Sequence, residues 1–146
     1  GKEKDLQGKS VTNGITPIIS IGTTDLHSMV QLYLGGPNDK ITTFVIVNEF
    51  KNHIEIKDNE ICILPNLKNK DMGSIMNAII QGVEKTYLNR QLPYVEIILP
   101  KKIEYCIGQL LQMKMMEMMF LGHLMNINPF DQPNVEEYKI ETKKYL

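Results

Sequence analysis

Histidine is the side chain best suited to move protons near neutral pH, and the 146-residue chain contains three, His27, His53 and His123. His27 follows the apolar run TPIISI and the small polar residues 22–24, and it stands in the first turn of an apolar stretch with helical spacing. Ligands of open α/β sheets collect where the carboxyl end of a strand leads into a helix. A helix N-terminus also disfavours the imidazolium. The position therefore predicts a neutral acid/base histidine; the alternative is a polar residue that caps the helix or lines an interface.

The other candidate side chains have simpler interpretations. His53 stands in a polar loop, which predicts a solvated residue, and His123 stands in a methionine-rich helix, where a packed or interface histidine is expected. The methionines within 113–119 suit an irregular core or a subunit contact better than a cofactor site. Cys62 and Cys106 lack metal-ligand spacing, so they are predicted to be buried thiols in a reducing compartment.

The stretch NPFDQPNVEEYK, residues 128–139, is the second place where polar side chains gather. Its two prolines predict a rigid turn around Asp131 and Gln132. Lys139 follows about two helical turns later, so an amide and an ammonium could face one site. By itself this signal is weak, because charged C-terminal helices are common.

Alternating strands and helices must position these residues. Apolar, β-branched runs predict strands at 16–22, 40–50 and 93–100, with a possible short strand at 60–64. Helical periodicity predicts helices at 25–34, at 72–89 with Asp71 as its N-cap, at 101–127, and after the C-terminal turn. The order is typical of an α/β fold with a parallel sheet. The apolar residues of the long helix surround more than one face, which predicts burial of 103–125 against another chain or a further domain.

Composition excludes several classes of function. The chain of 16.7 kDa has the length of one domain, and its formal net charge is −1 with scattered Lys and Arg, which gives no footprint for nucleic acid or an anionic membrane. No apolar run is long enough to span a membrane, and no signal peptide opens the chain. The first residue is glycine, which indicates a tag remnant or a piece of a larger protein.

Together, GTTDLHSMVQLYLGGPNDK and NPFDQPNVEEYK resemble the two C-terminal signatures of the phosphoglucose isomerase (glucose-6-phosphate isomerase) family. Their order, context and separation match, and the resemblance covers the whole chain. It implies an aldose–ketose isomerase of glycolysis and gluconeogenesis that takes a sugar phosphate, interconverts glucose 6-phosphate and fructose 6-phosphate, and uses neither a metal nor an organic cofactor.

The resemblance also implies an architecture. The expected fold is a three-layer αβα sandwich with a mainly parallel sheet, of the sugar-isomerase (SIS) type, followed by a helical tail. Residues 1–126 would form most of the second SIS domain, and residues 127–146 the C-terminal turn and the helix that carries the family's lysine. The implied partners are the N-terminal domain of the same protein and a second copy in a homodimer, in the cytoplasm.

Three residues match catalytic or binding positions of the family. His27 matches the histidine that helps to open the sugar ring, Lys139 the lysine that assists opening at the ring, and Gln132 a glutamine that lines the substrate pocket. Opening a hemiacetal moves a proton between O1 and the ring oxygen, which an imidazole and a positioned ammonium can do. In the family the histidine often serves the site of the neighbouring subunit.

The chain departs from the family pattern at four points. Leu26 replaces a usual glutamine, Asn134 a usual glycine, and Tyr138 stands where many relatives have glycine; none of these is a catalytic position. The fourth departure concerns the general base, a glutamate in an E-S-x-G-K motif. Because the chain starts at the GK of that motif, the glutamate would lie just before residue 1.

Without that base, the chain alone is predicted to be inactive. Glu3 is a conceivable substitute, but it stands in a charged run that predicts exposure. The alternative function, from a different class, is a sugar-phosphate-binding module without catalysis.

Overall fold

Two parallel strands form the sheet of this protein, β1 (Thr42–Glu49) and β2 (Tyr94–Lys101). The computed structural model describes residues 2–57 and 65–146. The strands pair from Thr42 opposite Tyr94 to Glu49 opposite Lys101, and Lys101 Nζ lies 3.0 Å from a Glu49 carboxylate oxygen. The strands predicted at 40–50 and 93–100 are therefore confirmed, since their β-branched residues suit a pleated surface.

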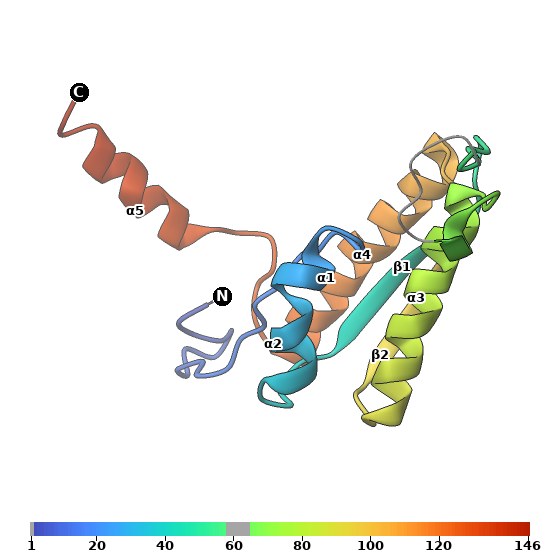
Figure 1. Ribbon diagram of the computed structural model, residues 1–146. Helices are drawn as coiled ribbons and strands as arrows, with labels where there is room; N and C mark the ends of the chain where they lie inside the picture. Colours follow the sequence, from blue (N-terminus) through green and yellow to red (C-terminus); the bar gives the residue numbers. More distant parts are fainter. Residues whose placement is uncertain (1, 58–64) are drawn as a thin grey trace. The chain divides into compact units, whose positions relative to one another are not determined.

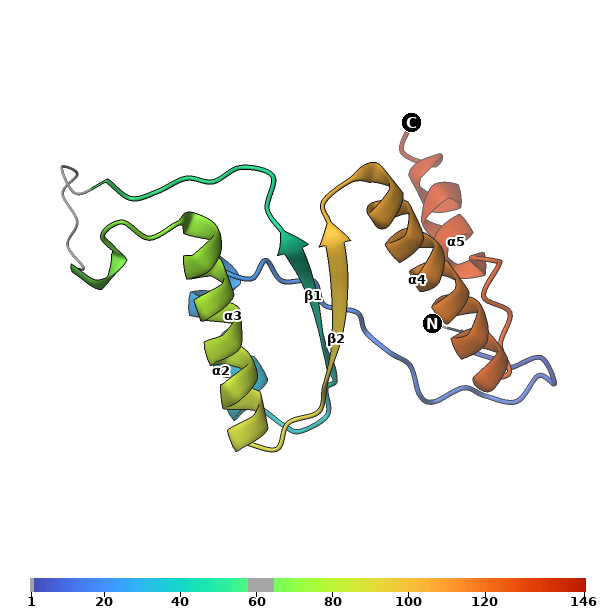
Figure 2. The ribbon, with the colours of Figure 1, turned by 90° about the vertical axis from the view of Figure 1, so that its right-hand side faces the viewer.

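Helix α3 (Met72–Asn89) connects the two strands and runs alongside them (Figure 2). It confirms the helix predicted at 72–89. Asp71 is its N-cap, as predicted, and accepts a hydrogen bond of 3.3 Å from the Ser74 amide. The same carboxylate accepts a bond of 3.1 Å from the Ile54 amide, so it also holds the loop that precedes the helix.

An aromatic cluster joins α3 to both strands. Tyr87 is 3% exposed, and its ring meets Phe44 of β1 edge-on at 5.2 Å and Tyr94 of β2 at 6.0 Å. The Tyr87 hydroxyl is also hydrogen-bonded to Thr42 Oγ1 at 3.0 Å. Such edge-to-face contacts add to the hydrophobic gain of burial. This cluster is the core of the sheet.

The chain divides into two compact units. One, here called the sheet unit, comprises residues 18–107; the other, the tail unit, comprises residues 1–17 together with 108–146. The sheet unit is therefore one continuous stretch of chain, whereas the tail unit combines the first and the last residues of the chain. Figure 1 labels the helices and strands and colours them along the sequence.

The strand predicted at 16–22 is wrong. This segment has no strand assignment, and Ile19 within it is 93% exposed. An apolar, β-branched run becomes a strand only where a neighbouring strand supplies hydrogen bonds, and the two described strands pair with each other. The possible strand at 60–64, with Cys62, lies outside the described residues.

The helix predicted at 25–34 consists of two short segments, α1 (Asp25–Ser28) and α2 (Val30–Gly35). Met29 separates them, yet its amide bonds to the Asp25 carbonyl at 2.7 Å and its carbonyl accepts from the Tyr33 amide at 3.2 Å. The helical direction is thus kept across the interruption.

Two further helices lie mainly in the tail unit. Helix α4 (Glu104–Leu124) begins at the end of the sheet unit and corresponds to the helix predicted at 101–127, with fewer residues at each end. Helix α5 (Pro133–Thr142) confirms the predicted C-terminal helix. No helix among the described residues is long and apolar enough to cross a membrane.

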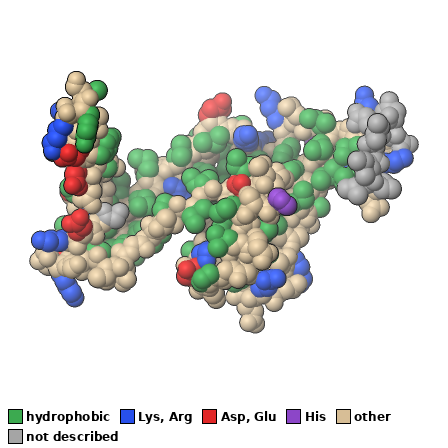
Figure 3. Space-filling model, turned by 60° about the vertical axis from the view of Figure 1, so that its left-hand side comes forward, with side chains coloured by type: hydrophobic (Ala, Val, Ile, Leu, Met, Phe, Trp, Pro, Cys, Tyr) green, Lys and Arg blue, Asp and Glu red, His purple; other side chains and the backbone are tan. Residues whose placement is uncertain are grey.

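Helix α4 carries many exposed apolar side chains. Leu111 is 59% exposed, Met118 57% and Phe120 64%. Hydrophobic side chains also lie at the surface on the face shown in Figure 3. Within this chain the helix is therefore not largely buried. Its burial against a further chain or domain stays a prediction, which this exposed apolar surface makes physically reasonable.

Candidate functional site

His27 is the third residue of α1, and it is exposed. The Asp25 carboxylate beside it accepts a hydrogen bond of 2.7 Å from the Ile21 amide, which fixes the entry into the helix. The preceding segment is not a strand, so the predicted passage from a strand end into a helix is wrong. The role of His27 as an acid/base residue stays a prediction.

Gln132 and Lys139 belong to α5. Gln132 is the N-cap residue with φ −135° and ψ 62°, and its side chain does not cap the helix. Pro133 follows at the first helical position, where its missing amide hydrogen has no cost. Lys139 lies in the last turn, and its Nζ is 2.6 Å from a Glu136 carboxylate oxygen. Gln132 and Lys139 therefore stand at opposite ends of the same helix.

The three predicted site residues are divided between the two units. His27 lies in the sheet unit, whereas Gln132 and Lys139 lie in the tail unit. The expectation that all three meet at one edge of the sheet stays a prediction.

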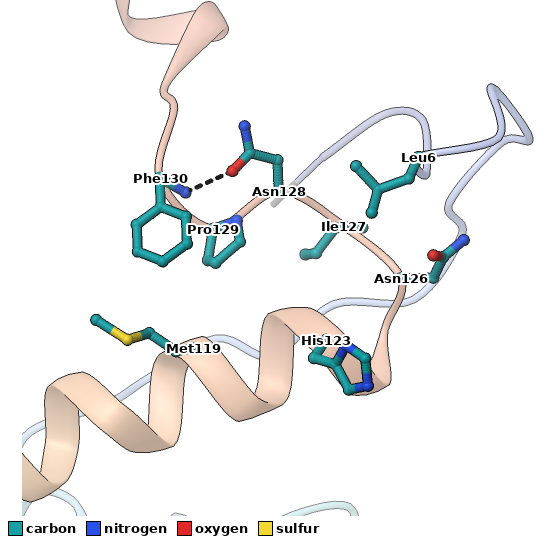
Figure 4. A pocket seen from close by; sticks show the side chains of 8 residues that line it. All are labelled: Leu6, Met119, His123, Asn126, Ile127, Asn128, Pro129 and Phe130. Carbon is teal, nitrogen blue, oxygen red and sulfur yellow. Dashed lines mark hydrogen bonds between the residues drawn. The ribbon is translucent and has the colours of Figure 1, made fainter.

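The NPFDQP loop, residues 128–133, is folded tightly against the end of α4. The Asn128 side chain accepts a hydrogen bond of 3.0 Å from the Phe130 amide, and the Pro129 ring lies against Gly122, where a Cβ atom would come within 2.9 Å of it. A pocket of about 280 Å³ lies here (Figure 4). Its lining is mainly apolar and comprises Leu6, Met119, His123, Asn126, Ile127, Asn128, Pro129 and Phe130.

The N-terminal segment, residues 2–11, is bound to this loop region by polar contacts. The Asp5 carboxylate accepts from the amides of Gln7 at 2.9 Å and Lys9 at 2.8 Å, which closes a turn. The Leu6 amide then donates to the Asn126 carbonyl at 2.9 Å, and the side-chain amides of Gln7 and Asn126 are hydrogen-bonded to each other. This segment is therefore ordered by contacts with residues more than a hundred positions away.

Lys2 makes the most distant of these contacts. Its ammonium forms an ion pair with the Asp131 carboxylate and donates to the Asp131 carbonyl at 2.8 Å. The Lys2 side chain is 14% exposed. A second pocket, of about 490 Å³, includes both residues in its lining. Sequence reasoning missed this pair, because two charges 129 residues apart leave no periodic or local signal.

Three of the remaining candidates fit their sequence-based interpretations: His53 is 78% exposed, with Nδ1 3.6 Å from an Asp71 carboxylate oxygen, Glu3 is exposed, and Cys106 is buried. His123 lines the smaller pocket but is exposed, so it is not packed within this chain, and its place at an interface stays a prediction. Across residues 2–57 and 65–146, no three His, Cys, Asp or Glu side chains are grouped in a way that could hold a metal ion.

The described groups with a shifted pKa, which are Asp39, Glu84 and Tyr94, are not among the predicted site residues. Burial raises the pKa of Glu84, and the charge of Glu96 raises it further; one Glu84 oxygen is buried without a hydrogen-bond partner among the described residues. Burial and the same two carboxylates raise the pKa of Tyr94. A hydrogen bond from Lys40 lowers the pKa of Asp39. These shifts describe the sheet unit and give no support to a catalytic acid there.

Comparison with known proteins finds glucose-6-phosphate isomerases among the relatives of this chain. A probable glucose-6-phosphate isomerase of Methanococcus maripaludis is 38% identical over 123 residues, which are 84% of this chain and 27% of that protein. A glucose-6-phosphate isomerase of Carboxydothermus hydrogenoformans is 34% identical over all of this chain and 32% of its own length. A scan against protein-family profiles finds no match.

A solved structure is also similar to this chain. The crystal structure of a hypothetical protein from Thermus thermophilus superposes with a TM-score of 0.88 at 32% identity, covering 99% of this chain and 34% of that one. The chain spans about a third of the relatives that it matches. Along its whole length, it is homologous to a portion of glucose-6-phosphate isomerases.

Proposed function

We propose that this chain acts as the C-terminal part of a cytoplasmic glucose-6-phosphate isomerase, which interconverts glucose 6-phosphate and fructose 6-phosphate. The observation that carries the proposal is its 34% identity, over the full chain, to a protein of that name. In this assignment residues 1–126 form most of a second SIS domain with an αβα sandwich, and residues 127–146 form its tail. The β1–α3–β2 unit supports the sandwich, because it is the repeating element of such folds.

Ring opening is the step assigned to His27 and Lys139. It removes the proton from the O1 hydroxyl and delivers one to the ring oxygen as the bond from C1 to that oxygen breaks. An imidazole can carry this proton, and an ammonium can stabilise charge that develops on the ring oxygen. His27 is exposed and could therefore meet a substrate held by another subunit.

Gln132 is assigned to substrate binding. A carboxamide offers two donors and an acceptor, which suit sugar hydroxyl groups. Although Gln132 is the N-cap residue of α5, its side chain accepts no hydrogen bond from the helix amides. Its side chain therefore remains free of the helix terminus and available to a ligand.

Proton transfer between C2 and C1, through an enediol, is assigned to a glutamate that precedes residue 1. Such a base must be held against the substrate carbon in a site that excludes water. Glu3 is exposed and does not fit that role. The chain alone is therefore expected to lack activity, since general base catalysis contributes typically about 10²–10⁴-fold.

The proposed partners are the other two thirds of the isomerase and a second copy in a homodimer. The exposed apolar side chains of α4, such as Met118 and Phe120, support an extensive contact of this kind. The chemistry assigned here needs no cofactor, because side chains alone can carry each proton.

A coupled assay of fructose 6-phosphate conversion tests the proposal. The chain alone should be inactive, and the protein extended by its N-terminal part should turn over and lose activity on His27→Ala or Lys139→Ala. Turnover by the chain alone that Glu3→Gln abolishes would contradict the assignment of the base. Binding of fructose 6-phosphate by the extended protein without turnover would favour the non-catalytic module instead.

A further inference from the structure

The tail unit contains one ionic contact that the proposed chemistry does not use. The Lys2 ammonium holds Asp131 at two points, its carboxylate and its main-chain carbonyl. We propose that Lys2 and Asp131 form a positioning pair, which fixes the NPFDQP loop and thereby the placement of Gln132. This inference rests on the proposed function, in which Gln132 binds the substrate.

The geometry distinguishes this pair from an ordinary surface ion pair. Exposed pairs contribute little, because both side chains remain hydrated and mobile. The Lys2 side chain is 14% exposed and the Asp131 side chain 55%, whereas Lys139 and Glu136 are 48% and 65% exposed, so the difference lies in the shielded ammonium of Lys2. A two-point contact that includes a main-chain oxygen also fixes the backbone at residue 131, not only a side chain.

The loop around Asp131 can transmit that constraint. Pro129 and Pro133 restrict φ on either side of the acidic residue, and the Asn128 side chain closes the turn onto Phe130. Gln132 follows Asp131 directly and begins α5. A shift at residue 131 therefore moves the pocket amide and the start of the helix that carries Lys139.

Two further hydrogen bonds hold the N-terminal segment to Asn126. The Leu6 amide and the Gln7 side chain bind Asn126, so the N-terminal segment is anchored before the loop as well as within it. With both anchors in place, residues 2–7 and the loop that precedes Gln132 hold each other in position. A misplacement of about 1 Å between reacting groups can lower a rate by about 10²-fold, so loss of one anchor should reduce turnover measurably.

The test uses the protein extended by its N-terminal part, with Lys2→Met, Asp131→Asn and the double variant. Lys4→Met is the matched control, because Lys4 belongs to the same segment and is exposed. We expect each single variant to lower kcat roughly tenfold with a smaller change in KM, and the double variant to be no worse than either. Lys2→Arg, which keeps two donors, should restore most of kcat, and the pH profile should not move.

Hydrogen exchange gives a readout that does not depend on activity. Amides of residues 128–135 should exchange faster in Lys2→Met than in Lys4→Met. If the wild-type extended protein fails to isomerise, the proposed function fails, while the exchange comparison still decides whether the pair holds the loop. Equal kcat in the Lys2 and Lys4 variants, additive losses in the double variant, or unchanged exchange would overturn the positioning pair.

Discussion

The sheet unit and the tail unit are stabilised by different kinds of contact. In the sheet unit, paired strands and the cluster around Tyr87 supply apolar packing between neighbouring elements. In the tail unit, the N-terminal segment is held by polar contacts to Asn126 and Asp131, and the NPFDQP loop by the fit of Pro129 against Gly122. The comparison indicates that the region with the NPFDQP motif depends on polar contacts between the two ends of the chain, whereas the sheet depends on a small aromatic core.

Tyr87→Ala should have the largest effect on stability, because it removes the most buried aromatic ring of the sheet unit. Replacing a buried large aromatic residue by alanine typically lowers the free energy of unfolding by about 3–5 kcal/mol. Urea denaturation measures the change, and Tyr145→Ala, at a position 88% exposed, is the control. Equal midpoints for the two variants would show that the aromatic cluster is not the core.

Gly122→Ala should destabilise the tail unit by about 1–3 kcal/mol, because the new methyl group would lie 2.9 Å from the Pro129 ring. Gly108→Ala is the matched control on the same helix, since nothing lies within 4 Å of its added Cβ atom. That control should raise stability slightly, by about 0.5–1 kcal/mol, through helix propensity. If thermal denaturation shows the same change for both variants, the contact between loop and helix does not matter.

Asp71→Ala should lower stability by about 1 kcal/mol through loss of the N-cap. The cause is the unpaired Ser74 amide, with a further contribution from the Ile54 amide that the same carboxylate holds. Asp71→Asn should keep most of the capping bond and most of the stability. Chemical denaturation of the two variants separates the cap from the charge, and a loss that is equal in both would assign the effect to charge.

Glu84→Gln should give the smallest effect, and one that depends on pH. Burial and Glu96 raise the pKa of Glu84 in the folded state, so the folded protein holds this proton more tightly than the unfolded chain does. The stabilisation that Glu84 gives the wild type is therefore present at pH values below the ordinary pKa range of glutamate. It is lost as the pH rises through the raised pKa of the folded state. The glutamine variant should match the wild type in acid and exceed it near neutral pH. Unfolding curves measured across that range would refute the effect if their difference did not change with pH.

Local signals in the sequence predicted most of the sheet unit. The strands at 40–50 and 93–100 and the helix at 72–89 follow from residue type and periodicity, and Asp71 from its place before an apolar helix. The run at 16–22 has the composition of a strand but does not form one. Strand pairing depends on a neighbouring strand, which composition does not specify.

The candidate site was predicted less completely. Motif matching located Gln132 and Lys139, and the structure gives both a defined place on α5. It did not anticipate that the segment before His27 is not a strand. The pair of Lys2 and Asp131 could not be predicted from either segment alone, since each charge taken by itself resembles an ordinary solvated residue.

The division of the tail unit between both ends of the chain has a consequence for synthesis on the ribosome. Residues 18–107 are contiguous, so the sheet unit can fold as soon as it has emerged. Residues 2–11, by contrast, must wait without their partners until Asn126 and Asp131 have been translated. At about 5–20 residues per second, this delay is on the order of ten seconds, during which residues 2–11 lack these contacts and are open to proteases and chaperones.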